Sequence, residues 1–146
     1  MIALGSDHGG FELKEAVMEH LKKRGLEYKD YGCYDTGSCD YPVYGRAAAK
    51  AVASGECEKG IVICTTGIGI SITANKIPGV RCALCTSEEL ARMTRLHNDA
   101  NMLALGASVV SKELACRIVD TFLDTGFSNE ERHIRRINLI EEKSEK

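Results

Sequence analysis

Residues 60–71, with the sequence GIVICTTGIGIS, join a short apolar run to a glycine-containing turn and then to a longer segment. An apolar run of this length that ends at a glycine turn is typical of a strand. The segment after the turn predicts a helix over residues 67–76. The whole stretch therefore predicts one strand–turn–helix unit of a parallel sheet.

Short apolar runs alternate with amphipathic stretches along all 146 residues. This alternation predicts βαβ units and a parallel sheet. Strands are expected at residues 2–6, 26–31, 60–64, 80–84 and 102–105. Helices are expected at residues 10–24, 44–54, 67–76, 86–96, 111–124 and about 129–143.

The predicted fold class is α/β, a doubly wound, Rossmann-like three-layer sandwich with a five-stranded parallel sheet and an extra C-terminal helix. A chain of this length fits one domain, residues 1–146. Ligands of doubly wound folds bind outside the carboxyl ends of the strands. The loops at those ends are therefore where a site is expected.

Local signals mark the ends of three helices. Gly25 is expected to cap the C-terminus of helix 10–24. Capping-box spacing, a Ser or Thr followed by a Glu three residues later, occurs at residues 86–89 and 128–131. Each box predicts a helix start.

The composition excludes several classes of partner. Apolar residues make up 44% of the chain, charged residues 27%, and the formal net charge is −2. This balance gives no reason to expect nucleic acid or an anionic membrane. The apolar runs are too short to span a bilayer, and residues 1–8 do not resemble a signal peptide. We therefore expect a cytoplasmic protein.

Seven cysteines are many for this length, but their odd number and the missing secretion signal favour reduced thiols. Cys64, Cys82 and Cys85 lie in apolar, strand-like runs, where free cysteine behaves as a small hydrophobe. Cys82 and Cys85 have the spacing of redox or zinc pairs, yet such pairs need a turn or a helix start. We expect no metal there.

The turn after Cys64 has the composition of an anion-binding loop. Its backbone N–H groups can point into one space at a helix N-terminus, which suits an anion or a developing oxyanion. That location also favours a thiolate, so Cys64 could act as a base. The alternative is a glycine-lined turn with an inert cysteine. The turn lacks the Gly-Lys-Ser/Thr sequence that a Walker loop needs. A cysteine phosphatase would need arginine where Ile70 stands.

Two other segments carry polar groups that suit ligand recognition. Asp7 and His8 follow the first strand among glycines and suit hydroxyl or phosphate recognition, although Asp7 could simply cap a helix. His97 and Asn98 close the fourth helix, where a cap and turn is the alternative interpretation.

Arg132 and Arg136 lie four residues apart on one face of the last helix and could hold a phosphate. A solvated arginine face is the alternative interpretation of this pair.

These motifs, in this order, resemble ribose-5-phosphate isomerase type B and its relatives, the allose- and galactose-6-phosphate isomerases. The resemblance spans almost the whole chain, and the cysteine loop with the His-Asn-Asp run is specific to that family. The matching segments are residues 5–10, 40–42, 60–72, 74–76, 79–81, 97–101 and 132–133.

The resemblance implies a role for each candidate residue. Cys64 would remove the proton from the second carbon of the sugar, and His97 would help to open the furanose ring. Arg132 and Arg136 would bind the phosphate. The turn would hold the enediolate oxygens through Thr65, Thr66, Gly67, Ile68 and Gly69, with Thr66 counted among the catalytic residues. The sugar or its phosphate would contact Asp7, His8, Tyr41 and Asn98.

The implied activity is the metal-independent interconversion of ribose 5-phosphate and ribulose 5-phosphate through a cis-enediolate, a step of the pentose phosphate pathway. A base and donors aimed at the oxyanion meet the needs of that reaction. No cofactor is expected, and the partner is a small sugar phosphate.

Two residues depart from the family pattern. Thr65 stands where glycine is usual after the cysteine, and Ser108 stands where a phosphate-binding arginine is common. These departures concern substrate affinity and sugar length more than the reaction type. Isomerisation of a six-carbon aldose phosphate is therefore one alternative.

Two alternatives lie outside this activity. A non-catalytic sugar-phosphate-binding subunit is disfavoured because Cys64 and His97 are both present. A thiol redox or sensing protein rests on the cysteine count alone.

Chain direction, together with the roles that the resemblance implies for Cys64 and His97, predicts a site shared between two subunits. Helix 86–96 starts at the edge of the sheet that holds Cys64 and runs away from it. His97 should therefore lie roughly 16 Å from that edge. We expect a homodimer in which His97 reaches the Cys64 of a neighbouring chain, with a tetramer as a further alternative.

Overall fold

The structure, a computed structural model, describes residues 1–142. Its centre is a sheet of five parallel strands in the order β2-β1-β3-β5-β4. The predicted five-stranded parallel sheet is confirmed. The strands are β1 (Ile2–Ser6), β2 (Tyr28–Asp30), β3 (Lys59–Cys64), β4 (Cys82–Leu84) and β5 (Met102–Gly106).

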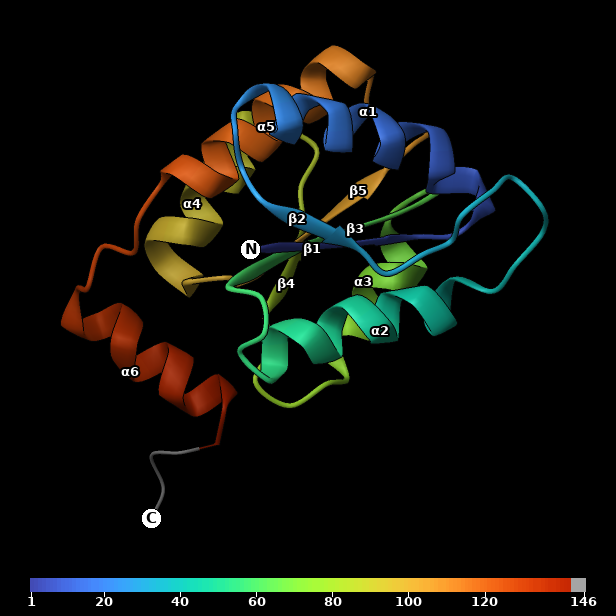
Figure 1. Cartoon of the computed structure of the whole chain (residues 1–146). Coiled ribbons are helices and arrows are strands. Elements are labelled where there is room, and N and C mark those ends of the chain that lie inside the picture. The colour runs from blue at the N-terminus through green and yellow to red at the C-terminus, as the bar shows by residue number, and fades with distance from the viewer. Residues whose placement is uncertain (143–146) are drawn as a thin grey trace.

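Helices cover both faces of the sheet. Figure 1 shows α1 and α5 on one face and α2 and α3 on the other, so the predicted three-layer sandwich is confirmed. α4 packs against α5, and α6 lies apart from the sandwich beside the turn η2. Their bounds are η1 (His8–Gly10), α1 (Phe11–Lys23), α2 (Tyr41–Ala53), α3 (Ile68–Asn75), α4 (Glu88–Met93), η2 (Thr94–Asn98), α5 (Lys112–Asp124) and α6 (Glu131–Ile140).

The central strand β3 is buried on both faces because helices cover both sides of the sheet. Successive side chains of a strand point to opposite faces. Ile61 and Ile63 accordingly pack in the core on the α1 and α5 side, whereas Val62 and Cys64 pack with α2 and α3. Because of this alternation, the side chain of Cys64 lies on the face of the sheet that α2 and α3 cover.

The two edge strands are shorter than predicted. β2 spans three residues instead of 26–31, and β4 spans three residues instead of 80–84. Each pairs with a neighbour on one side only. An edge strand lacks the second ladder of hydrogen bonds, so an apolar run can leave the sheet there before it ends.

Helix α2 begins at Tyr41, three residues before the predicted start at 44. Pro42 stands in its first turn, where the fixed φ of proline suits a helix and its missing N–H costs nothing. The proline was therefore the signal for the earlier start.

The predicted helix 86–96 is two different elements. α4 is capped by Ser87, whose hydroxyl accepts from the N–H of Leu90 at 3.1 Å, and not by Thr86. After α4 the chain widens into the π-helical turn η2, which a left-handed Asp99 (φ 45°) ends. The turn is a tertiary feature and has no signature in the periodicity of the sequence.

The capping box predicted at 128–131 is wrong. Asn129 has a φ of 61°, which interrupts the chain between Ser128 and the helix. α6 starts at Glu131, and the hydroxyl of Ser128 instead donates to the carbonyl of Leu96 at 2.7 Å. The helix ends at Ile140, before the predicted end at about residue 143, and residue 143 itself lies outside the described residues.

Gly25 ends α1 as predicted. Its φ is 73°, in the region that favours glycine. The N–H of Leu26 reaches back to the carbonyl of Leu21 at 3.0 Å and closes the end of the helix.

All seven cysteines are free thiols. Cys82 begins β4 and Cys85 directly follows that strand, as expected from their apolar surroundings. Burial raises the pKa of the Cys85 thiol to about 11 and raises that of Cys82 as well. Both thiols therefore stay protonated near neutral pH, unlike a reactive pair.

A fully buried lysine ties α1 to the edge of the sheet. The side chain of Lys14 has 0% exposure, and its Nζ donates to Asp30 at 2.6 Å and to the carbonyl of Cys33. The rings of Phe11 and Tyr34 lie 5.6 Å from the ammonium. These contacts fix the start of loop 31–40, which lies at the carboxyl edge of the sheet (Figure 1).

Replacing Lys14 with methionine should lower the free energy of unfolding by on the order of 3 kcal/mol, because the change leaves the carboxylate of Asp30 without its cation. Urea unfolding measures the loss. Lys22→Met is the matched control, since Lys22 is exposed on the same helix. Equal stability of the two variants would contradict an anchoring role for Lys14.

Candidate active site

Cys64 is the last residue of β3, and it is buried beneath the turn that leads into α3. The N–H of Gly67 lies 3.2 Å from its Sγ. A backbone donor in this position favours a thiolate, because it stabilises negative charge on sulfur. The thiol is therefore placed at the carboxyl edge of the sheet with a group that supports its charged form.

The turn after Cys64 is held against β5 by contacts between backbones. Gly67 caps α3 with a φ of 81°. An added Cβ at this position would meet backbone atoms of β5 at 2.9–3.0 Å. A Cβ at Gly106 would lie 2.4 Å from the carbonyl oxygen of Thr66. Glycine is required at both positions because no side chain can rotate out of the way.

A cavity of about 530 Å³ opens above the thiol. Seven of the predicted site residues come together around it. Gly67, which donates to the thiol, lies in the same turn. The lining residues are Asp7, Tyr41, Cys64, Thr65, Thr66, Ile68, Gly69 and Ile72.

Helix α3 presents an apolar edge to this cavity. Ile68 and Ile72 lie one turn apart, and both are exposed. Tyr41 packs so closely on Gly69 that a Cβ there would lie 2.5 Å from the phenol ring. Ile72 was not among the predicted site residues, although its i+4 spacing from Ile68 indicated a shared face.

Asp7 both caps a helical turn and lines the cavity. Its carboxylate accepts from the N–H of Gly10 at 3.0 Å, so the capping interpretation is confirmed for one oxygen. His8 points elsewhere, because its Nδ1 accepts from the N–H of Cys39 at 3.2 Å. This bond ties η1 to loop 31–40.

The two departures from the family pattern contact each other. Both the N–H and the hydroxyl of Ser108 donate to the carbonyl of Thr65, at 2.9 and 2.8 Å. A second cavity, of about 430 Å³, adjoins this contact. Its lining residues include Thr65 and Ser108 together with Gly9, Glu12 and Lys112.

His97 and Asn98 lie in η2, before β5. The ring of His97 stacks on that of His133 at 4.4 Å, with an angle of 21° between the planes. The amide oxygen of Asn98 accepts from the hydroxyl of Thr94 at 3.0 Å. The cap-and-turn interpretation of this segment is thus confirmed, although the turn is π-helical.

Cys64 and His97 lie at opposite edges of the sheet. β5 pairs with β3 so that Met102 lies beside Gly60 and Gly106 beside Cys64. The four steps from Gly60 to Cys64 span roughly 13 Å. His97 belongs to η2, which leads into the amino end of β5, so it lies toward the other edge of the sheet from the thiol. One chain does not bring these two residues together.

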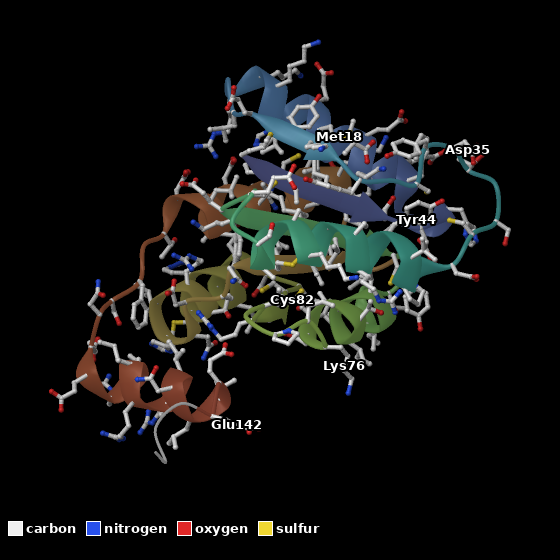
Figure 2. The ribbon with its side chains drawn as sticks, turned by 60° about the horizontal axis from the view of Figure 1, so that its bottom comes forward. Met18, Asp35, Tyr44, Lys76, Cys82 and Glu142 are labelled. Carbon is white, nitrogen blue, oxygen red and sulfur yellow. The ribbon has the colours of Figure 1, made fainter. Side chains whose placement is uncertain are left out.

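Arg132 and Arg136 also lie away from the cavity. Figure 1 shows α6 on the side of the molecule opposite to loop 31–40, and Figure 2 shows Asp35 of that loop and Glu142, just after α6, at opposite ends. Both arginines are exposed. Arg132 forms a surface ion pair with Glu130 at 2.5 Å.

Sequence reasoning gave no role to Arg81, which joins η2 to the end of α6. Its guanidinium donates to the carbonyls of Asn98 and Asp99, each at 2.9 Å, and to Glu141 at 2.6 Å. Arg81 lay in a segment that matches the family, but only the structure reveals its partners.

A family model described as Ribose/Galactose Isomerase matches residues 2–140. The chain belongs to the ribose/galactose isomerase family. It is 46% identical over 139 residues to ribose-5-phosphate isomerase B of Escherichia coli, covering 95% of this chain and 93% of the relative. The predicted family and its isomerase class are confirmed.

Solved structures agree with this assignment. Ribose-5-phosphate isomerase B of Clostridium thermocellum has a TM-score of 0.95 at 55% identity, covering 97% of this chain and 95% of that one. The Mycoplasma genitalium enzyme with bound ribulose-5-phosphate has a TM-score of 0.91 at 38% identity, covering 97% and 93%. The doubly wound fold is therefore that of the family.

Two kinds of feature are missing from residues 1–142. No helix in this part of the chain combines the length and apolarity that a membrane crossing needs. Nor do three or more His, Cys, Asp or Glu side chains gather there as a metal site would require.

Replacing Gly106 with alanine should lower the free energy of unfolding by about 1–3 kcal/mol, because the new methyl group overlaps backbone of the cysteine turn. Thermal or urea unfolding measures this change. Gly126→Ala is the control, since nothing lies within 4 Å of its added Cβ. A similar effect of both substitutions would mean that the turn can move away from β5.

Proposed function

We propose that this chain is an aldose–ketose isomerase that interconverts ribose 5-phosphate and ribulose 5-phosphate through a cis-enediolate. The observation that carries the proposal is the placement of Cys64 under a cavity at the carboxyl edge, with a backbone N–H on its sulfur. The relatives from Escherichia coli and Clostridium thermocellum, which are ribose-5-phosphate isomerases B, support this choice of substrate. None of the steps below requires a metal or a cofactor.

The reaction begins with the cyclic sugar. His97 moves a proton from the anomeric hydroxyl to the ring oxygen, and the bond between that oxygen and the first carbon breaks. The electrons of the O–H bond form the aldehyde. His97 is a fitting shuttle because an imidazole can accept and donate a proton near neutral pH.

Cys64 then removes the proton from the second carbon. The electron pair forms the double bond between the first two carbons, and negative charge develops on the carbonyl oxygen. Cys64 returns the proton to the first carbon, the proton of the hydroxyl on the second carbon passes to the oxyanion on the first carbon, and the electrons of that O–H bond form the carbonyl of the ketose. Backbone N–H groups of the turn act as donors near the developing oxyanion. This turn consists of Thr65, Thr66, Gly67, Ile68 and Gly69.

The remaining residues bind the substrate in this proposal. Asp7 and Tyr41 line the same cavity as the thiol and contact sugar hydroxyls. His8, the residue after Asp7, is hydrogen-bonded to loop 31–40 and would contact the sugar or its phosphate only after its ring turns toward the cavity. Asn98 adds a sugar contact from η2, and the phosphate is held by Arg132 and Arg136 of α6.

The two halves of this machinery require two chains. Cys64 lies at the carboxyl edge, whereas η2 and α6 lie at the amino edge. A homodimer with a two-fold axis would place His97 and Arg132 of each chain over the cavity of the other. Such an enzyme would act in the cytoplasm, in the pentose phosphate pathway, as a dimer or as a pair of dimers.

One observation favours a second substrate class. Ser108 is small, and the cavity of about 430 Å³ beside it adjoins the catalytic cavity at Thr65. This space suits a six-carbon aldose phosphate such as allose 6-phosphate. Incubating the purified protein with ribose 5-phosphate and with allose 6-phosphate, and measuring ketose formation, separates the two candidates.

Replacing Cys64 with alanine should lower the kcat for ribose 5-phosphate by on the order of 10³-fold and leave binding within a few-fold, because the base acts in the transition state. Ketose formation and inhibitor binding measure the two effects. Cys82→Ala and Cys85→Ala are the controls. Comparable losses in all three variants would mean that the thiols matter for packing rather than for catalysis.

Mixing Cys64→Ala chains with His97→Ala chains should restore activity. A dimer that holds one chain of each kind has one intact site, so equal mixing with random pairing gives about a quarter of the wild-type rate. Subunit exchange is followed with differently tagged chains. If exchange is complete and activity stays at the level of the separate variants, the shared site does not exist.

A further inference from the structure

The stacked pair of His97 and His133 joins two elements that are distant in sequence. His97 comes from η2 and His133 from α6, and their ring centroids lie 4.4 Å apart with nearly parallel planes. The proposed mechanism uses His97 and leaves His133 without a task.

His133 is an unusual residue for its position on α6. It is 7% exposed, whereas residues 131, 132 and 134–136 of the same helix are exposed. Its Nε2 is buried and finds no hydrogen-bond partner within residues 1–142. A leucine or phenylalanine would fill the same space without a stranded polar atom, so packing alone does not account for a histidine here.

The surroundings keep His133 neutral. Burial lowers the pKa of its imidazole most, and the neighbouring His97 lowers it further, as do Arg132 and Arg136. Glu130 acts in the opposite direction. A neutral ring can lie flat against His97 whether or not His97 carries its proton, since the face of an aromatic ring also accommodates a cation.

We propose that His133 is a positioning residue that holds the ring of His97 at the angle needed for ring opening. During that step the proton passes from the anomeric hydroxyl to His97 and from His97 to the ring oxygen. Each transfer needs the imidazole nitrogen in line with a different oxygen, so a freely rotating ring would be productive only part of the time. The inference rests on the proposed role of His97.

His133 acts through His97 and not on the substrate, because its Nε2 has no access to solvent in the chain. A phosphate contact through this atom would need α6 to move. The stack also links the phosphate-binding helix to the ring-opening residue, so both groups keep one relative position.

The test is a double-mutant cycle. His133→Leu removes the flat ring, whereas His133→Phe keeps one, and each is made in the wild type and in His97→Ala. kcat and KM for ribose 5-phosphate are measured with the melting temperature. Arg135→Gln, an exposed change on the same helix, is the control. If His133→Leu lowers the melting temperature, His133→Gln replaces it.

We expect His133→Leu to lower kcat about tenfold with little change in KM, and His133→Phe to stay within about threefold. In the His97→Ala background neither change should matter further. Equal losses with Leu and Phe, or a loss that persists without His97, would assign His133 to packing. A raised KM with unchanged kcat would assign it to the phosphate. If His97→Ala itself has no effect, the proposed function of His97 fails instead.

Discussion

All five strands run in the same direction, and this one constraint limits how much of a reaction site a single chain can hold. Each crossover helix must return to the amino edge before the next strand starts. The turn with Cys64 therefore lies at one edge, and the segment with His97, which precedes β5, lies at the other. Side-chain rotation cannot bridge an offset that the backbone imposes, so the proposed mechanism needs a second chain to supply His97.

The carboxyl edge gains its rigidity from backbones in direct contact. Gly106 lies against the carbonyl of Thr66, and Ser108 donates twice to the carbonyl of Thr65. These contacts hold the turn against β5 at Thr65 and at Thr66. Donors that are already fixed need no reorganisation during a reaction, which is the main advantage of such a turn over a mobile loop.

The sequence predicted the structural features that depend on local pattern, and it did not predict the features that depend on tertiary contacts. The strand β3, the cap at Gly25 and the glycine turn after Cys64 all have local signatures. The π-helical turn η2 and the burial of Lys14 have none, because each depends on a neighbour that the periodicity does not reveal. His133 is the clearest case: on a helix with exposed arginines, only the stack with His97 explains its burial.

Arg81 binds the end of η2 and the end of α6 at the same time. Its guanidinium spans the carbonyls that end η2 and the carboxylate of Glu141 just after α6. Ser128 fastens the linker before α6 to Leu96 of η2, so the helix is held at both ends. The stacked rings of His97 and His133 lie between the Arg81–Glu141 and Ser128–Leu96 contacts. In the proposed dimer the ring-opening and phosphate-binding groups would therefore reach a neighbouring cavity as one preformed unit, because their relative geometry is determined within the chain that carries them.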